Sequence, residues 1–150
     1  MKIHLAQPNH RFGNNAFLPY SVACLWAFAR QDKLIRDTFQ LARPMQFDRE
    51  PFSNIISSKP DVLALSCYVW NWEYNLALAE AVKNDNPECK VILGGPQVPK
   101  NKGIHNIDAQ IIGEGELAFV NYLKKLTIGS ADAIYYYALD RTRDLNQFPS

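Results

Sequence analysis

Short apolar runs alternate with amphipathic segments through the middle of the chain. Each run has apolar residues at successive positions, which is typical of strands buried on both faces of a parallel sheet. The runs are Val62 to Tyr68, Lys90 to Leu93 and Ala109 to Ile112. A helix capped by Asn71 and ended by Asn86 and Pro87 follows the first run, and a second helix, with Phe119 and Leu123 inward, follows the third. This alternation predicts an open, doubly wound α/β sheet, mostly parallel, with about five strands.

The flanking segments predict further elements of the same kind. Met1 to Ala6 is expected to form a strand, and Pro19 to Gln31 a half-buried helix with apolar residues at helical spacing. Weaker periodicity predicts a strand over Asp37 to Ala42, a short helix over Phe52 to Ser57 and an edge strand over Ile134 to Tyr137. From Asp140 to Ser150 the chain turns polar, which indicates a linker after a folded domain of residues 1–139.

Length, composition and charge narrow the class of protein. With 150 residues, 47% of them hydrophobic and 21% charged, the chain is expected to form one globular domain. A formal net charge of +1 is too small to attract a nucleic acid or an anionic membrane, so neither is expected as a partner. The longest apolar run, Val22 to Ala29, is too short to span a bilayer, and we expect a cytoplasmic protein. Three cysteines without Cys-x-x-Cys spacing exclude a structural zinc site or an iron–sulfur cluster held by this chain alone.

Candidate chemistry gathers in the loops that follow the predicted strands. Ligands of open α/β sheets bind outside the carboxyl ends of the strands, so these loops are the place to expect a site. They are Asn9 to Leu18, Ser66 to Asn71, Gly94 to Val98 and Gly113 to Glu116. They hold most of the glycines of the chain, together with Ser66 and the aromatic residues Tyr68 and Trp70.

Each of these signals has a structural and a functional interpretation. Gly94 and Gly95 either form a tight turn or, because they have no Cβ atoms, let a ligand approach the backbone closely. Ser66 either satisfies a neighbouring backbone group or faces a ligand. Tyr68, Trp70 and Trp72 either pack a helix against the sheet or, on one side of an extended strand, offer apolar area to a ligand.

Two further patterns indicate little chemistry by themselves. Residues 113–118 satisfy G-x-G-x-x-A between a strand and a helix, but Glu114 and Glu116 would place carboxylates where a pyrophosphate must lie, and they suit dipole compensation instead. His10 lacks nearby acidic or thiol residues at metal-ligand spacing. Cys67 has no clear base in the sequence, so a thiolate nucleophile is unsupported.

Taken in order, the segments resemble the cobalamin-binding domain that precedes the catalytic barrel in cobalamin-dependent radical S-adenosylmethionine (SAM) enzymes. The segments that carry the resemblance are Phe17 to Ser21, Leu25 to Ala27, Asp61 to Asn71, Val91 to Pro96, Ile111 to Glu116 and Phe148 to Ser150. The resemblance covers nearly the whole chain. It implies a flavodoxin-like or Rossmann-like cobalamin-binding fold over residues 1–139, with residues 140–150 leading toward a radical SAM barrel that the sequence lacks.

The resemblance also implies how the cofactor is held. Cobalamin would be bound base-off, with its dimethylbenzimidazole tail in a slot beside the sheet, where Gly94 and Gly95 leave room and Ser66 hydrogen-bonds the base. Gly113 and Gly115 would admit the nucleotide loop. The expected cofactor-binding residues are Leu18, Pro19, Ser66, Cys67, Tyr68, Val69, Trp70, Asn71, Gly94, Gly95, Pro96, Gln97, Gly113, Glu114, Gly115 and Glu116.

The first loop departs from the pattern of related cobalamin domains. Those domains ligate cobalt through an Asp-x-His-x-x-Gly loop, and here Pro8 stands in the place of the Asp, although His10 and Gly13 match. Without that carboxylate the imidazole loses its orienting partner. We therefore expect an uncoordinated residue between Tyr68 and Trp72 to cover the lower face of cobalt, with Trp70 as first choice.

The cluster motif of the family, C-x-x-x-C-x-x-C, is absent from this sequence. The resemblance therefore implies a module that is not catalytic alone, with SAM and a 4Fe-4S cluster held by a radical SAM barrel in cis or in trans. The implied chemistry is methyl transfer via methylcobalamin. Two alternatives from other classes are a flavodoxin-like domain that binds a nucleotide or flavin, and a docking domain without a ligand.

Overall fold

A single parallel sheet organises the computed structural model, which describes residues 1–9, 13, 15, 17–100, 102–130 and 135–137. Its strands are β1 (Lys2–Asn9), β2 (Gln40–Leu41), β3 (Gln46–Asp48), β4 (Val62–Ser66), β5 (Lys90–Gly94), β6 (Ala109–Ile112) and β7 (Tyr135–Tyr137). The order is β2-β1-β4-β5-β6-β7, with β3 also beside β1, and each strand pair is parallel. The chain moves outward from β1 to β2 and β3 and then returns to β4 on the other side, so the strand order reverses between β1 and β4.

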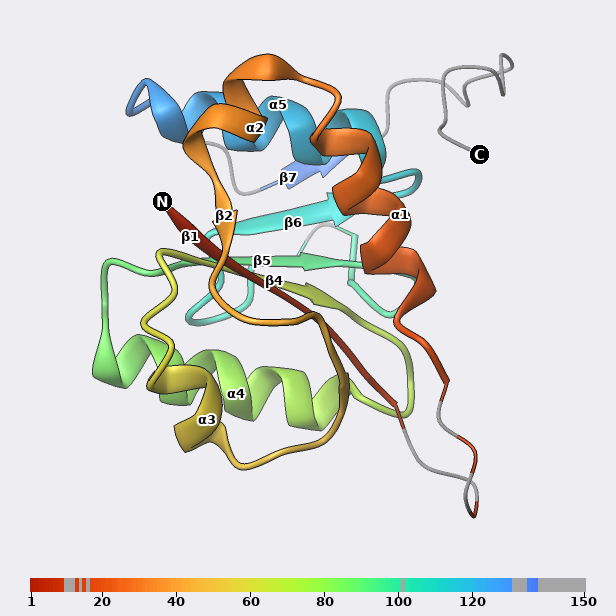
Figure 1. Cartoon of the computed structure of the whole chain (residues 1–150). Helices are drawn as coiled ribbons and strands as arrows, with labels where there is room; N and C mark the ends of the chain where they lie inside the picture. Colours follow the sequence, from red (N-terminus) through yellow and green to blue (C-terminus); the bar gives the residue numbers. More distant parts are fainter. Residues whose placement is uncertain (10–12, 14, 16, 101, 131–134, 138–150) are drawn as a thin grey trace.

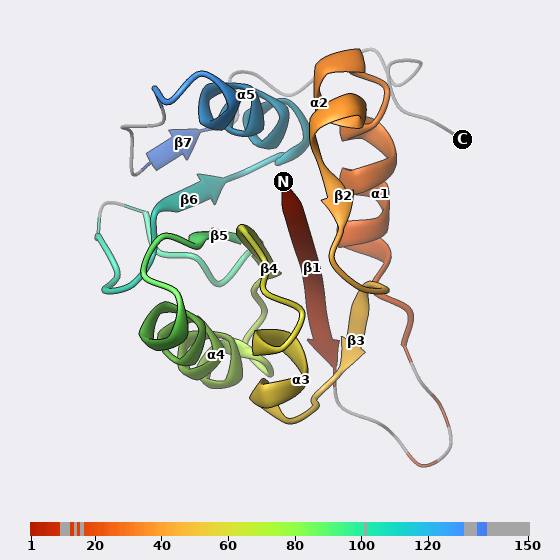
Figure 2. The same cartoon turned by 60° about the vertical axis from the view of Figure 1, so that its left-hand side comes forward.

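Helices cover both faces of this sheet, as Figures 1 and 2 show. The helices are α1 (Tyr20–Ala29), α2 (Lys33–Thr38), α3 (Phe52–Ile56), α4 (Trp72–Asp85) and α5 (Glu116–Thr127). On one face, α1, α2 and α5 lie together, and on the other α3 packs beside α4. The expected doubly wound α/β class is confirmed.

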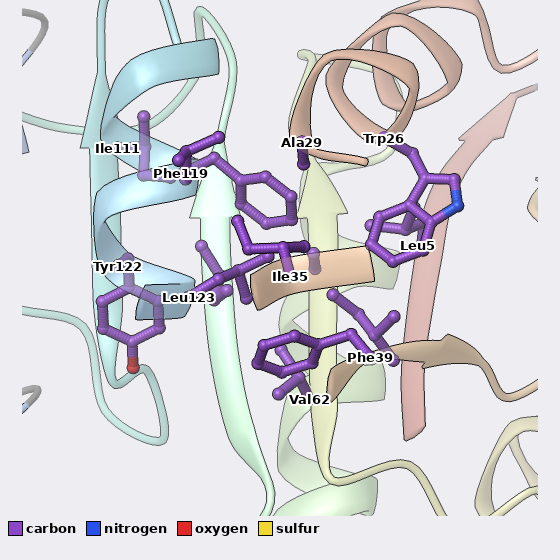
Figure 3. Packing of buried hydrophobic residues seen from close by; sticks show 14 of the residues in the cluster. Leu5, Trp26, Ala29, Ile35, Phe39, Val62, Ile111, Phe119, Tyr122 and Leu123 are labelled. Carbon is purple, nitrogen blue, oxygen red and sulfur yellow. The ribbon is translucent and has the colours of Figure 1, made fainter. Parts of the chain in front are cut away.

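The alternation of side chains along the strands divides the core into two layers. In β4, Ala64 belongs to the layer under α1, α2 and α5, whereas Leu63 and Leu65 belong to the layer over α3 and α4. Every residue of β4 is buried, as the successive apolar positions predict. Figure 3 shows Trp26 of α1 and Phe119 of α5 packed into the first layer. The two helices thereby fix the walls of the space above the strand ends.

The structure corrects several boundaries in the first half of the chain. β1 runs on through Asn9 instead of ending at Ala6, with a register shift between these residues. The strand expected over Asp37 to Ala42 is mostly wrong, because α2 occupies Lys33–Thr38 and only Gln40–Leu41 extends. The carboxylate of Asp32 accepts hydrogen bonds from the backbone N–H groups of Leu34 and Ile35, which starts that helix.

The strand count is also higher than expected. Among the described residues the sheet has seven strands: β2 lies within the strand expected over Asp37 to Ala42, and β3 has no counterpart in the sequence prediction. β4 ends at Ser66, two residues before the expected end at Tyr68. Asn71 does precede α4, but its side chain makes no capping hydrogen bond. Ile134 and the expected linker, residues 140–150, lie outside the described residues.

None of the helices among the described residues combines the length and the apolar character needed to cross a membrane.

Candidate functional site

A cavity lies at the carboxyl ends of β4, β5 and β6, between α1 and α5, with a volume of about 150 Å³. Its walls are mostly apolar, with Leu25 from α1, Ile92 from β5, Ile111 from β6 and Phe119 from α5. A space of about 150 Å³ with apolar walls is large enough to take a benzene-sized ring. The cavity is half-open, so a larger flat molecule would extend from it beyond the strand ends.

The two adjacent glycines at the end of β5 have different roles. Gly94 lines the cavity, and a Cβ placed on it would meet nothing closer than the Cβ of Ile111, at 3.8 Å. Gly95 has a φ of +105°, and a Cβ there would lie 2.6 Å from the carbonyl oxygen of Cys67. The turn interpretation therefore holds for Gly95, whose missing side chain makes room for the backbone of Cys67. The missing side chain of Gly94 instead leaves space in the cavity.

Ser66 belongs to a chain of hydrogen bonds that links three elements. Its Oγ lies 2.9 Å from the Oγ of Ser21 on α1, and Ser21 donates to Oε1 of Gln7 on β1 at 2.6 Å. The backbone N–H of Ser21 donates to the same Gln7 oxygen, so this oxygen can only accept. The single hydrogen of Ser21 is thus used, and Ser66 donates to Ser21 unless a ligand takes its hydrogen. The sequence analysis missed Ser21 and Gln7, although Ser21 stands one turn before Leu25 on the same helix face.

The backbone at the end of β4 is held by two buried asparagines. Asn71 and Asn75 donate to the carbonyl oxygen of Ser66 at 2.9 and 3.2 Å, and Oδ1 of Asn71 accepts from the backbone N–H of Tyr68. Asn75 was not among the expected residues, and its position among apolar neighbours on α4 is the only signal for it. Burial raises the pKa of the Cys67 thiol to about 12, which disfavours the thiolate form that a nucleophile needs.

The three aromatic residues near this strand end do not share one side. Tyr68 lines the cavity and stacks on Trp70, with ring centroids 4.6 Å apart and planes 8° from parallel. Trp72 begins α4 and packs against the core layer on the α3 and α4 face. Three rings on one side would have required the strand to extend to Trp72, and β4 ends at Ser66, so the packing interpretation holds for Trp72.

The loop after β6 brings backbone and one charge to the cavity. Gly113, with a φ of +89°, lies in the loop, and Gly115 directly precedes α5. Among the described residues that line the cavity, Glu116 in the first turn has the only charged side chain. A pyrophosphate placed on the N-terminus of α5 would face this carboxylate, which disfavours the dinucleotide interpretation of G-x-G-x-x-A.

The structure brings together some of the cofactor-binding residues that were expected from the sequence. Ser66, Tyr68, Gly94, Gly95, Gly113, Gly115 and Glu116 line the cavity. The other expected residues, which are Leu18, Pro19, Cys67, Val69, Trp70, Asn71, Pro96, Gln97 and Glu114, are not in its lining. Leu18 and Val69 are strongly exposed. His10 lies outside the described residues, and within the described part of the chain no three His, Cys, Asp or Glu side chains gather as a metal site.

Comparisons with known proteins bear on the same region. A family model of the B12 binding domain matches residues 28–123, a segment that contains β4, β5 and β6. The cobalamin-dependent radical SAM methyltransferase TokK of Streptomyces tokunonensis is 37% identical over 110 residues, which are 69% of this chain and 16% of TokK. The 2-(S-pantetheinyl)-carbapenam-3-carboxylate methyltransferase of Streptantibioticus cattleyicolor is 36% identical over 111 residues, again 69% of this chain and 16% of the relative. The match thus spans about a sixth of the length of either curated relative.

Proposed function

The chain belongs to the B12-binding domain family, and on that premise we propose that it holds cobalamin base-off, with the dimethylbenzimidazole tail in the cavity between α1 and α5. The observation that carries this proposal is the cavity itself. It lies at the carboxyl ends of β4, β5 and β6, the edge at which ligands of open α/β sheets bind, and it has room for a flat ring beside Gly94.

The residues of the cavity suit a planar aromatic base. Leu25, Ile111 and Phe119 provide apolar walls, and the hydroxyl of Ser66 is the polar group at the end of β4. When a base nitrogen arrives, Ser66 can rotate its hydrogen from Ser21 to that nitrogen, since a hydroxyl rotates freely. The proposed binding residues are those named from the sequence, with Ser21 and Gln7 added as the support of Ser66.

We place Trp70 under the lower face of cobalt, as an uncoordinated cover. Its exposed fraction of 43% leaves indole surface for a corrin, and it stacks on Tyr68, which reaches the cavity. An indole has no lone pair to offer a metal, since its nitrogen only donates a hydrogen bond. The lower face would therefore be shielded by apolar surface.

The proposed partner is a radical SAM barrel, in cis or in trans, that holds SAM and a 4Fe-4S cluster. The names of the two methyltransferase relatives support this partner and a methyl transfer. Bound cobalamin would supply a cobalt centre that carries a methyl group. The residues of this chain would bind and shield the cofactor and would not be catalytic alone.

We propose a cytoplasmic setting, which the free thiols of Cys24, Cys67 and Cys89 support.

The proposal is tested by loading the full chain with hydroxocobalamin, followed by desalting. We expect retained colour and an absorption spectrum in which the base is displaced from cobalt. Gly94→Val should weaken retention, since its methyl groups would enter the cavity, whereas Gly94→Ala should weaken it less. Ser66→Ala should also weaken retention, and Ser57→Ala, on a hydroxyl that bonds a carbonyl of α3, is the matched control.

Other results would contradict the proposal in recognisable ways. Retention of flavin mononucleotide without cobalamin would favour the flavin alternative. A chain whose melting temperature responds to neither cofactor would be a docking domain without a ligand. Equal retention by wild type and Gly94→Val would show that the tail is held elsewhere.

A further inference from the structure

Trp70 is held at three points by three different parts of the chain. Its indole Nε1–H donates to Oδ1 of Asn9 at the end of β1, at 3.1 Å. Its carbonyl oxygen accepts from the guanidinium of Arg49, just after β3, and its ring stacks on Tyr68. A half-exposed aromatic side chain in a loop has several rotamers open to it, and the hydrogen bond to Asn9 and the stacking on Tyr68 select one, while Arg49 holds the backbone.

Asn9 is itself fixed in one orientation. Its Nδ2 donates to the carbonyl oxygen of Phe17 at 3.3 Å while Oδ1 accepts from the indole. An indole N–H only donates and a carbonyl only accepts, so exchanging the two ends of the amide would break both hydrogen bonds. Asn9 is buried, and it pairs with Asp48 of β3 through the sheet. The amide is therefore a rigid bracket between β1, the segment before α1 and Trp70.

The hydrogen bond to Asn9 fixes which part of the Trp70 indole is exposed to a bound molecule. The only polar atom of the side chain is directed at Asn9, so the exposed part of the indole is apolar ring. Released from Asn9, the N–H would need another acceptor, and water is the ready one. With the N–H bonded to Asn9, the exposed surface of Trp70 is apolar and attracts no water. With the N–H released, the same surface would bind water.

We propose that Asn9 is a positioning residue that turns the Trp70 N–H into the protein and so keeps water from the lower face of cobalt in bound cobalamin. This inference rests on the proposed function. It assigns to β1 a role other than ligand donation, since the residue that acts is Asn9 and it touches the indole, not the metal.

The first half of the test needs no cofactor. In the full chain labelled with ¹⁵N, the indole N–H signal of Trp70 is assigned by its loss in Trp70→Phe, and its hydrogen exchange is measured. We expect Asn9→Ala to speed this exchange by about fivefold, the effect of losing one hydrogen bond. Asn9→Asp, which keeps an acceptor oxygen, should stay within about twofold of wild type. Asn54→Ala, on an exposed amide of α3, is the control.

The second half uses the chain loaded with hydroxocobalamin and reduced to cobalt(II). The electron paramagnetic resonance spectrum reports whether an oxygen donor occupies the lower axial position. We expect no such donor in wild type, Asn9→Asp and Asn54→Ala, and a bound water in Asn9→Ala. Melting temperatures of the four proteins check that each is folded.

The outcomes separate the two proposals. If the chain retains no cobalamin, the proposed function fails, and this inference fails with it, whatever the indole exchange shows. If cobalamin is retained and Asn9→Ala frees the indole while cobalt keeps the wild-type spectrum, the positioning role is overturned and the proposed function stands. Unchanged indole exchange in Asn9→Ala would overturn the bracket itself.

Discussion

The two adjacent glycines at the carboxyl end of β5 have different structural roles. Gly94 and Gly95 are neighbours, but only Gly95 needs a left-handed backbone and only Gly95 would place a Cβ against the backbone of Cys67. The sequence predicted that the pair is special, and it left open whether a turn or a ligand required it. The answer depends on which way each Cα–H bond points, and that is a property of the folded strand end.

The glycine pair gives a stability prediction. Gly95→Ala should lower the free energy of unfolding by about 2 to 4 kcal/mol, because it combines backbone strain with a contact of 2.6 Å to Cys67. Gly129→Ala, also at positive φ but with open space around it, should cost only about 1 kcal/mol. Urea denaturation of both variants measures the difference. Equal losses would mean that the loop at Gly95 relaxes away from Cys67.

His4 gives a prediction on pH. Burial lowers its pKa from the ordinary value of 6.5, an effect only partly offset by the hydrogen bond to Gln46. The Nδ1 atom of His4 has no partner within the described part of the chain, so a second proton there would be buried without an acceptor. The unfolded chain therefore binds the proton more readily, and the contribution of His4 to stability is complete above pH 6.5 and declines as the pH falls below it.

The measurement is the urea midpoint at about pH 7.5 and at about pH 5.5, for wild type and for His4→Gln. Wild type should lose more stability over this interval than the variant, which cannot titrate at this position. If both proteins lose the same amount, His4 does not carry the pH dependence.

At the scale of the elements, the ends of β1 and β4 and the first turn of α1 build the site jointly. Gln7, Ser21 and Ser66 are 14 and 45 residues apart in the chain, and they meet because β1 and β4 are neighbours and α1 lies over them. The sequence predicted these elements and their carboxyl edge. It did not predict which polar residues meet, since that depends on register and on the path of the first loop.

The error at α2 has a different cause. Its six residues are too few for a periodic pattern to be visible, and its start depends on the capping carboxylate of Asp32, which also lies 2.5 Å from Nζ of Lys124 on α5. The same residue thus starts a helix and ties it to another element. The lysine hydrogen bond is the main reason that the pKa of Asp32 lies below its ordinary value of 3.8.

Substitution of Asp32 separates these two roles. Asp32→Ala should lower the free energy of unfolding by about 1 kcal/mol through loss of the cap. Asp32→Asn keeps an oxygen for the cap and loses only the charge, and a partly exposed ion pair contributes at most about 1 kcal/mol. Because the pKa is lowered on folding, the advantage of wild type over Asp32→Asn should be present above pH 3.8 and vanish as the pH falls below it. Urea midpoints across this range check both statements, and an advantage that persists in acid would contradict the second.

For the molecule as a whole, the sequence predicted the doubly wound sheet, and it pointed to the carboxyl edge, where the structure has its cavity. Successive apolar positions in β4, β5 and β6 predicted the fold, and glycines of the loops after β5 and β6 line the cavity. The sequence did not predict β3, the separation of Trp72 from Tyr68 or the bracket at Asn9. These depend on contacts between distant segments, which a pattern along one segment cannot report.

The central claim is that the cavity between α1 and α5 takes the nucleotide tail of cobalamin. The most direct test compares the affinity of the full chain for cobalamin and for cobinamide, a corrinoid without the tail. Wild type should bind cobalamin on the order of tenfold or more tightly, because only cobalamin can bury an aromatic base in the cavity. Gly94→Val should reduce this preference and leave the affinity for cobinamide nearly unchanged. Equal affinity of wild type for the two corrinoids would contradict the account.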